Sequence, residues 1–170
     1  MTRKPKLLEA GHTDEIYTPA YALKPLLPFI PPSVKVVWET AWGQGHLAKH
    51  LSDAGYSVAG GPGEDFFLPF DSHQEAEMII TNPPYSIKDK WIKRTYEIGL
   101  PFALLLPVAA IGGKRRTRLY TKYGMQLIVP DCRVNFITPN GGTSSWFHVA
   151  WFTHGLNLAK DLNFVEMKRE

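Results

Sequence analysis

The 170-residue chain contains only one cysteine, Cys132, so no disulfide bond can form within it. This scarcity excludes the class of small secreted proteins that are stapled by disulfides, and it is typical of a reducing cytoplasm. No apolar run approaches the roughly 20 residues needed to span a bilayer. Met1 to Leu8 also lacks the apolar segment of a signal peptide. We therefore expect a cytoplasmic protein without a membrane partner.

Acidic residues are missing from one long stretch of the sequence, between Glu97 and Asp131. Five basic residues cluster there instead: Lys114, Arg115, Arg116, Arg118 and Lys122. The formal net charge of +3 permits a nucleic-acid partner without requiring one. A solvated helix face is the ordinary explanation for such a cluster, but the complete lack of acids favours nucleic acid.

Internal repeats, low-complexity tracts and interdomain linkers are also missing. The length and an apolar content of 44% suit one domain with its own core. We expect a single domain over residues 1–170, with flexible ends at about 1–12 and 157–170. Such a chain has no room for a separate target-recognition domain.

What the sequence does contain is an alternation of strand-like and helix-like segments. We expect strands at 34–39, 56–59, 78–80, 102–106, 126–129, 134–137 and 146–152, with a turn at 140–142 between the last two. Helices are expected after the glycines at 43 and 45, over 89–98 and over 114–123. This alternation predicts an α/β sandwich with a mostly parallel sheet, whose ligands bind at the carboxyl ends of the strands.

Residues 78–86, Met-Ile-Ile-Thr-Asn-Pro-Pro-Tyr-Ser, are the most informative segment. The apolar strand end is followed at once by Asn82, Pro83, Pro84 and Tyr85. The two prolines fix the backbone, Asn82 offers an amide oxygen, and Tyr85 offers a flat face for stacking. This combination makes a receptor for a planar group that bears an NH2. An ordinary rigid turn is the alternative interpretation.

The turn from residue 41 to residue 45 contains two glycines, Gly43 and Gly45, between the first expected strand and its helix. Glycines let the backbone approach a ligand closely, and the helix amino terminus adds favourable dipoles. Upstream, Thr18 is a plausible helix N-cap before Pro19, and Pro25 should shorten or kink the helix that follows.

Together, Tyr17-Thr18-Pro19, the glycine turn and Asn82-Pro83-Pro84-Tyr85 resemble class I S-adenosylmethionine-dependent methyltransferases, chiefly the N6-adenine DNA methyltransferases. The likeness covers about residues 14–155. It implies a Rossmann-like fold with a mostly parallel seven-stranded sheet, an antiparallel last strand and helices on both faces. It also implies methyl transfer from S-adenosyl-L-methionine to the exocyclic amino group (N6) of adenine in DNA. A protein-glutamine methyltransferase, an RNA-adenine methyltransferase and a catalytically inactive binding module remain alternatives.

The resemblance also implies site residues. The expected catalytic residues are Asn82, Pro83, Pro84 and Tyr85. The expected cofactor-binding residues are Tyr17, Thr18, Pro19, Glu39, Ala41, Gly43, Gly45, Asp65, Phe66 and Asn82. Substrate contacts are expected from Lys114, Arg115, Arg116, Arg118, Phe136 and Trp146. Methyl transfer of this kind needs no metal, and His46 and His50 are more easily explained as solvated than as ligands.

One departure from the resembled pattern concerns the end of the second strand. An acid usually stands there to hold the ribose hydroxyls, whereas this chain has Gly60 and Gly61. The missing charge-assisted hydrogen bond is worth about 1.5–3 kcal/mol. Either the cofactor binds weakly, Glu39 holds the ribose alone, or Glu64 takes over. For Phe66, core filling is as good an explanation as contact with the cofactor.

Overall fold

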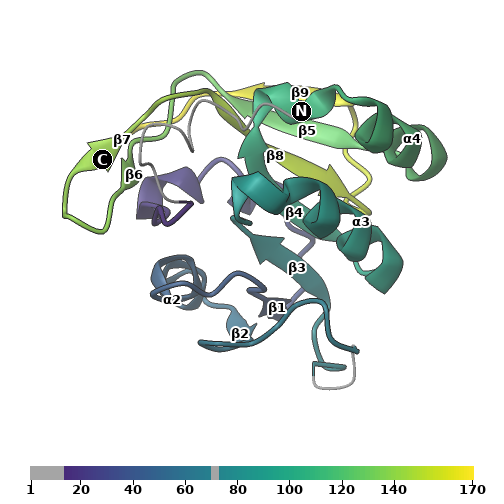
Figure 1. Ribbon diagram of the computed structural model, residues 1–170, viewed down its shortest axis with the longest axis horizontal. Coiled ribbons are helices and arrows are strands. Elements are labelled where there is room, and N and C mark those ends of the chain that lie inside the picture. Colours follow the sequence, from purple (N-terminus) through teal and green to yellow (C-terminus); the bar gives the residue numbers. More distant parts are fainter. Residues whose placement is uncertain (1–13, 70–72) are drawn as a thin grey trace, which may run out of the picture.

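A computed structural model describes residues 14–69 and 73–170, and its main feature is a seven-stranded sheet in the order β2-β1-β3-β4-β8-β5-β9 (Figure 1). The strands are β1 (Val36–Trp38), β2 (Ser57–Ala59), β3 (Met78–Thr81), β4 (Phe102–Pro107), β5 (Gln126–Pro130), β8 (Val149–His154) and β9 (Leu162–Val165). Strand β8 runs antiparallel to both β4 and β5, and the other pairings in this sheet are parallel. The predicted mostly parallel α/β sheet is confirmed.

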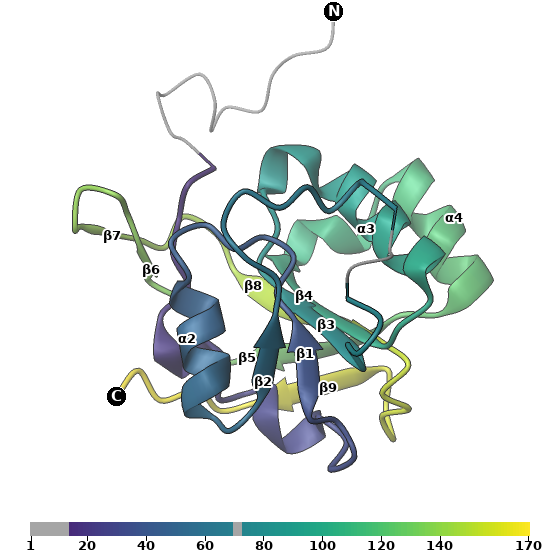
Figure 2. The ribbon, with the colours of Figure 1, turned by 90° about the horizontal axis from the view of Figure 1, so that it is seen from below.

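Helices cover both faces of the sheet. Helix α2 (His46–Asp53) packs on one face, and helices α3 (Lys88–Ile98) and α4 (Lys114–Tyr123) pack on the other (Figure 2). Successive strand residues point to opposite faces, so Val37 joins the core on the α2 side and Trp38 joins the core on the α3 side. Because β4 is buried on both faces, its sequence is an unbroken apolar run. Among the described residues, no helix has the length and apolarity needed to cross a membrane.

The expected helices over 89–98 and 114–123 match α3 and α4 closely. Each one ends at a glycine in a positive-φ conformation, Gly99 (φ 81°) after α3 and Gly124 (φ 87°) after α4. The Gly124 amide donates a hydrogen bond of 2.8 Å to the Tyr120 carbonyl. A residue with a Cβ would be strained at these positions, which is why glycine is such a reliable stop signal.

The carboxyl-terminal part of the chain differs from the expectation. Residues 157–170 were expected to be a flexible end, but they contain β9, which pairs in parallel with β5. The last strand is therefore parallel, and the antiparallel strand is the one before it, β8. Strand β9 is ordered by long-range hydrogen bonds and not by burial of its side chains. Phe164 in this strand is 76% exposed, but Asn163 Nδ2 donates a hydrogen bond of 3.1 Å to the Leu127 carbonyl in β5. The other expected flexible end, 1–12, lies outside the described residues.

The strand expected at 134–137 does not join the main sheet. It forms β6 (Phe136–Ile137), which pairs with β7 (Thr143–Ser144) in a separate two-stranded hairpin. The glycine-rich turn at 140–142 connects these two short strands and does not precede the last strand. Gly141 has φ 77°, and the Thr138 amide donates to the Gly142 carbonyl at 2.9 Å. The hairpin projects from the sheet on the side of α2 (Figure 1).

The helix expected after Pro19 is broken into two 3-10 turns, η1 (Ala20–Ala22) and η2 (Leu27–Phe29). Pro25 and Pro28 cannot donate backbone hydrogen bonds, so a continuous helix cannot form. Thr18 does not cap the first turn, because its hydroxyl oxygen accepts a hydrogen bond from Asn82 instead. Two further 3-10 turns, η3 (Tyr85–Ile87) and η4 (Val108–Ile111), precede α3 and α4.

Candidate functional site

Three segments that are distant in the sequence meet beyond the carboxyl ends of the parallel strands β1 and β3. They enclose a small cleft of about 30 Å³. Its lining residues are Ile16, Tyr17, Thr18, Glu39, Ala41, Trp42, Gly43, Gln44, His46, Leu47 and Asn82. Six of the residues predicted to bind the cofactor thus share one cleft: Tyr17, Thr18, Glu39, Ala41, Gly43 and Asn82. Gly45 belongs to the same glycine turn, while Pro19 does not line the cleft.

Asn82 has an oriented and unsatisfied side chain. Its Nδ2 donates a 3.1 Å hydrogen bond to Thr18 Oγ1, which leaves Oδ1 as the free acceptor. This Oδ1 atom is buried and has no hydrogen-bond partner among the described residues. A buried polar atom without a partner costs about 1–3 kcal/mol, and such atoms require an explanation in a folded protein. The arrangement suits an incoming N–H donor.

Tyr85 lies at the centre of an aromatic cluster. Its ring centroid is 5.4 Å from that of Phe147 and 6.4 Å from that of Phe136, with both pairs in edge-on geometry. The Tyr85 hydroxyl is buried and has no hydrogen-bond partner among the described residues, whereas the residue as a whole is only partly buried. Burial raises the pKa of Tyr85 well above its ordinary value, with a smaller contribution from Asp14. Tyr85 therefore remains neutral.

The loop that contains Tyr85 is tied to the start of the described chain. Asp14 accepts hydrogen bonds from the Ser86 amide at 3.2 Å and from the Ser86 hydroxyl. Pro83 is buried, and Pro84 precedes η3 in an extended conformation with φ −58° and ψ 120°. The two prolines thus fix the backbone between Asn82 and Tyr85, as the sequence predicts.

Glu39 is a buried acid at the end of β1. Only 2% of the residue is exposed, and its Oε1 accepts hydrogen bonds from the Ala41 amide at 2.8 Å and from the Thr81 hydroxyl. Burial raises the pKa of Glu39 to about 7, because loss of water disfavours the carboxylate more than these two hydrogen bonds favour it. A large part of the population is therefore protonated at neutral pH.

We expect Glu39→Gln to remove a pH dependence of stability. The folded protein holds the Glu39 proton more tightly than the unfolded chain, so this stabilisation is complete below pH 4.5 and is lost as the pH rises through 7. The free energy of unfolding should fall by about 2–3 kcal/mol more in the wild type than in Glu39→Gln between pH 4.5 and 8. Denaturant titrations across this range measure the difference. Parallel pH profiles of the two proteins would contradict it.

The Tyr17-Thr18-Pro19 segment is held from three directions. The Tyr17 ring stacks on His46, with centroids 4.6 Å apart and planes 2° from parallel. His50 Nε2 lies 3.1 Å from the Thr18 carbonyl, to which it donates as the neutral tautomer, and burial lowers the pKa of His50. The backbone of Tyr17 exchanges hydrogen bonds of 2.8 and 3.0 Å with Ile137 in β6.

His46 and His50 are therefore part of the site, which the sequence did not predict. Their spacing of four residues on α2 is the signal that could have identified them, because it places both rings on one helix face. Within residues 14–69 and 73–170, no group of three or more His, Cys, Asp or Glu side chains is placed to hold a metal ion.

Glycine at position 60 is a structural requirement. Its φ is 106°, and a Cβ there would collide with the Glu39 carbonyl oxygen. The acid that usually ends the second strand cannot stand at this position. Glu64 lies nearby instead, with Oε1 3.4 Å from the place that a Cβ of Gly61 would take and Oε2 2.7 Å from His73 Nε2.

We expect Gly60→Ala to lower the free energy of unfolding by about 2 kcal/mol or more, since strain at a positive φ adds to a backbone clash. Gly63→Ala is the matched control, because Gly63 has φ 78° but no atom within 4 Å of the added Cβ. Thermal unfolding of the two variants compares them. An equal loss of stability in both variants would show that the clash with the Glu39 carbonyl does not contribute to the destabilisation.

Asp65 and Phe66 are not brought into the same cleft. They line a separate cavity of about 290 Å³ together with Trp38, Thr40 and Glu64. Phe66 is 3% exposed, and its ring is stacked on Trp91 at 4.9 Å and edge-on to Trp38 at 5.5 Å. Core filling is therefore what the structure shows for Phe66. The Asp65 carboxylate accepts a hydrogen bond of 2.9 Å from the Phe67 amide.

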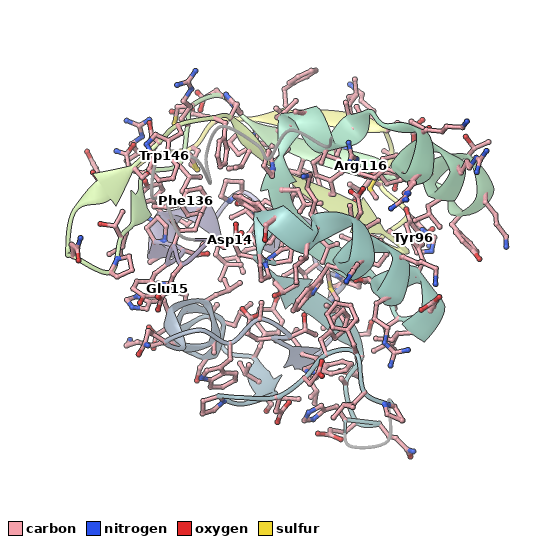
Figure 3. All side chains as sticks on the ribbon, viewed as in Figure 1. Asp14, Glu15, Tyr96, Arg116, Phe136 and Trp146 are labelled. Atoms are coloured by element: carbon pink, nitrogen blue, oxygen red, sulfur yellow. The ribbon has the colours of Figure 1, made fainter. Side chains whose placement is uncertain are left out.

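The predicted substrate-binding residues fall into three groups. Phe136 lies in β6 and Trp146 lies two residues beyond β7 (Figure 3). Phe136 is buried against Tyr85, whereas Trp146 is 42% exposed. Phe147, which the sequence analysis did not assign, has its ring centroid closer to that of Tyr85 than Phe136 does. Lys114, Arg115 and Arg118 are exposed on α4. Arg116, in contrast, is committed to an ion pair with Asp89.

No protein-family model matches the chain, and no curated protein matches its sequence.

Proposed function

We propose that the protein is an S-adenosylmethionine-dependent N-methyltransferase with a Rossmann-like class I fold, and that its acceptor is the N6 amino group of adenine in DNA. The observation that supports this most directly is the buried, unpartnered Asn82 Oδ1, oriented by Thr18 beside the glycine turn. The mostly parallel sheet with helices on both faces is compatible with such a fold.

The chemistry follows from the properties of an aromatic amine. The exocyclic nitrogen of adenine is a poor nucleophile because its lone pair is delocalised into the ring. If Asn82 Oδ1 and the Pro83 carbonyl accept its two N–H groups, the nitrogen is biased toward a tetrahedral and more nucleophilic form. S-adenosylmethionine would supply the methyl group, and the extra proton that the amine then carries would leave to solvent after transfer. Catalysis of this kind depends on positioning and preorganised dipoles and needs no strong general base.

An aromatic acceptor is favoured over a glutamine side chain by the surroundings of Tyr85. The Tyr85 ring can stack on a nucleobase, and Phe136 and Phe147 hold that ring in place by edge-on contacts. A base within a duplex cannot reach such a site, so it must be flipped out or presented on a single strand.

Cofactor binding would involve Glu39, the amides of the glycine turn and the amino terminus of α2. Gly43 (φ 53°) and Gly45 (φ 78°) adopt conformations that favour glycine, and Gly43 lines the cleft. The present volume of about 30 Å³ is the space of about one water molecule. Side chains that line the cleft must therefore move for the cofactor to enter.

The test is calorimetry with S-adenosylmethionine, followed by incubation of labelled cofactor with DNA, RNA and protein acceptors. We expect binding and label transfer to DNA. Absence of cofactor binding would overturn the enzyme proposal and leave an inactive binding module. Transfer to RNA or to protein glutamine would keep the chemistry and replace the acceptor.

A further inference from the structure

Helices α3 and α4 lie side by side on the face of the sheet opposite α2 (Figures 1 and 2). A basic groove lies between their side chains. It encloses about 490 Å³, far more than the cleft at Asn82. Its lining comprises one acid, one leucine and six basic residues: Asp89, Leu119, Lys90, Lys93, Arg115, Arg116, Arg118 and Lys122. Three of the basic residues, Lys90, Lys93 and Lys122, were not among the predicted substrate contacts.

The single acid of the groove is neutralised from within. Arg116 Nη1 lies 2.5 Å from Asp89 Oδ1, and Arg116 Nε donates to the carbonyls of Ala110 at 3.0 Å and Gly112 at 2.6 Å. The Arg116 side chain is only 17% exposed. Arg116 therefore links α4 to α3 and fixes the position of the two helices that form the groove. Because its guanidinium is already paired, we do not count Arg116 among the ligand contacts.

Two more basic groups are also occupied. Lys93 forms an ion pair with Glu97 along α3, and Lys122 Nζ lies 4.8 Å from the centroid of the Tyr123 ring. Within the described part of the chain, Lys90, Arg115 and Arg118 make no ion pair and no side-chain hydrogen bond, and all three are exposed. Arg115 and Arg118 are three residues apart on α4, so they lie on one helix face.

The groove begins close to the candidate catalytic loop. Helix α3 starts at Lys88, directly after η3, which contains Tyr85. A strand whose base is held at Tyr85 therefore has its neighbouring phosphates within reach of the amino-terminal half of α3. The lining of the groove suits a phosphodiester backbone better than a lipid surface, because all its side chains except Asp89 and Leu119 are basic, whereas a lipid surface requires apolar anchors. The exposed apolar residues Ile87, Ile111 and Tyr123 lie near the ends of α3 and α4 and do not line the groove.

We propose that the α3–α4 groove binds the phosphodiester backbone of one nucleic-acid strand, with Lys90, Arg115 and Arg118 as the phosphate contacts. The choice of nucleic acid as the ligand of the groove rests on the proposed function. The test of the groove measures binding, however, and does not require methyl transfer.

The test uses a labelled single-stranded DNA, whose fluorescence anisotropy is titrated with the full chain at several salt concentrations. The groove variant combines Lys90→Ala, Arg115→Ala and Arg118→Ala. The matched control combines Lys35→Ala, Lys160→Ala and Lys168→Ala, which removes the same charge from exposed positions outside the groove. We expect the affinity of the groove variant for the DNA to fall about tenfold or more. The slope of log K against log salt concentration should decrease in magnitude by about 2, because each lost phosphate contact on a single strand contributes roughly 0.7. The control should keep the wild-type slope.

Equal losses in the two variants would overturn the proposal, because net charge alone would then explain binding. Loss of binding to vesicles of anionic phospholipid, with DNA binding unchanged, would assign the groove to a membrane surface instead. If methyl transfer to DNA is observed and the groove variant binds like the wild type, only the groove proposal fails. If the groove variant loses DNA binding but no acceptor is methylated, only the proposed activity fails.

Discussion

Replacing Asn82 with alanine should lower the rate of methyl transfer by about 10²–10³-fold, the usual cost of removing one preorganised polar group from a transition state. The variant loses the buried Oδ1 atom, which has no other task among the described residues. Binding of S-adenosylmethionine should change much less, since Glu39 and the glycine turn are left intact. Single-turnover transfer of a labelled methyl group and calorimetry measure the two quantities separately.

Thr18→Val is the matched control for Asn82→Ala. Valine has nearly the same shape, but it cannot accept the 3.1 Å hydrogen bond from Asn82 Nδ2. The Oδ1 atom remains but is no longer oriented, so we expect an intermediate loss of about tenfold. Thr18→Ser, which keeps the hydroxyl, should restore most of the rate. Near-normal activity in Asn82→Ala would show that the amide does not contact the acceptor, whatever Thr18→Val does.

The elements that the sequence predicted well are those whose signals are local. The apolar run of β4 and the glycines after α3 and α4 define their elements without help from distant residues. The shared position of Glu39 and Asn82 was also predictable, because each follows a parallel strand and parallel strands bring their carboxyl ends to one edge of a sheet. Thr18 follows no such strand, and only the resemblance placed it at the site.

Other features depend on partners that no local pattern reveals. Strand β9 is largely exposed and exists through its pairing with β5, so its sequence does not look like a buried strand. Arg116 is indistinguishable in sequence from Arg115, yet it meets Asp89 across a separation of 27 residues. Thr18 looks like a helix cap, but the hydrogen bond with Asn82 takes its hydroxyl oxygen away from that role.

The second large effect is expected at Tyr85, where two substitutions should differ strongly in their effect on methyl transfer. Tyr85→Ala removes the ring, and we expect about a 100-fold loss of methyl transfer, since stacking of one base on an aromatic ring is worth about 1–3 kcal/mol and the acceptor also loses its alignment. Tyr85→Phe keeps the ring and removes only the buried hydroxyl that has no partner. Its activity should stay within a few-fold of the wild type.

Tyr85→Phe should also stabilise the protein by about 1 kcal/mol, which corresponds to a rise in Tm of about 2–4 °C for a chain of this size, because an unsatisfied polar atom is removed from the interior. Tyr96→Phe is the matched control, since the Tyr96 hydroxyl donates a 2.7 Å hydrogen bond to the Gly124 carbonyl and its loss should destabilise by a similar amount. Calorimetric unfolding of the wild type and the two variants gives the sign of each change in stability directly.

A lower Tm for Tyr85→Phe than for the wild type would mean that the Tyr85 hydroxyl has a hydrogen-bond partner in the folded protein. A rate as low as that of Tyr85→Ala would move the catalytic role from the ring to the hydroxyl, which would then be the donor or acceptor that the nucleobase meets at this loop.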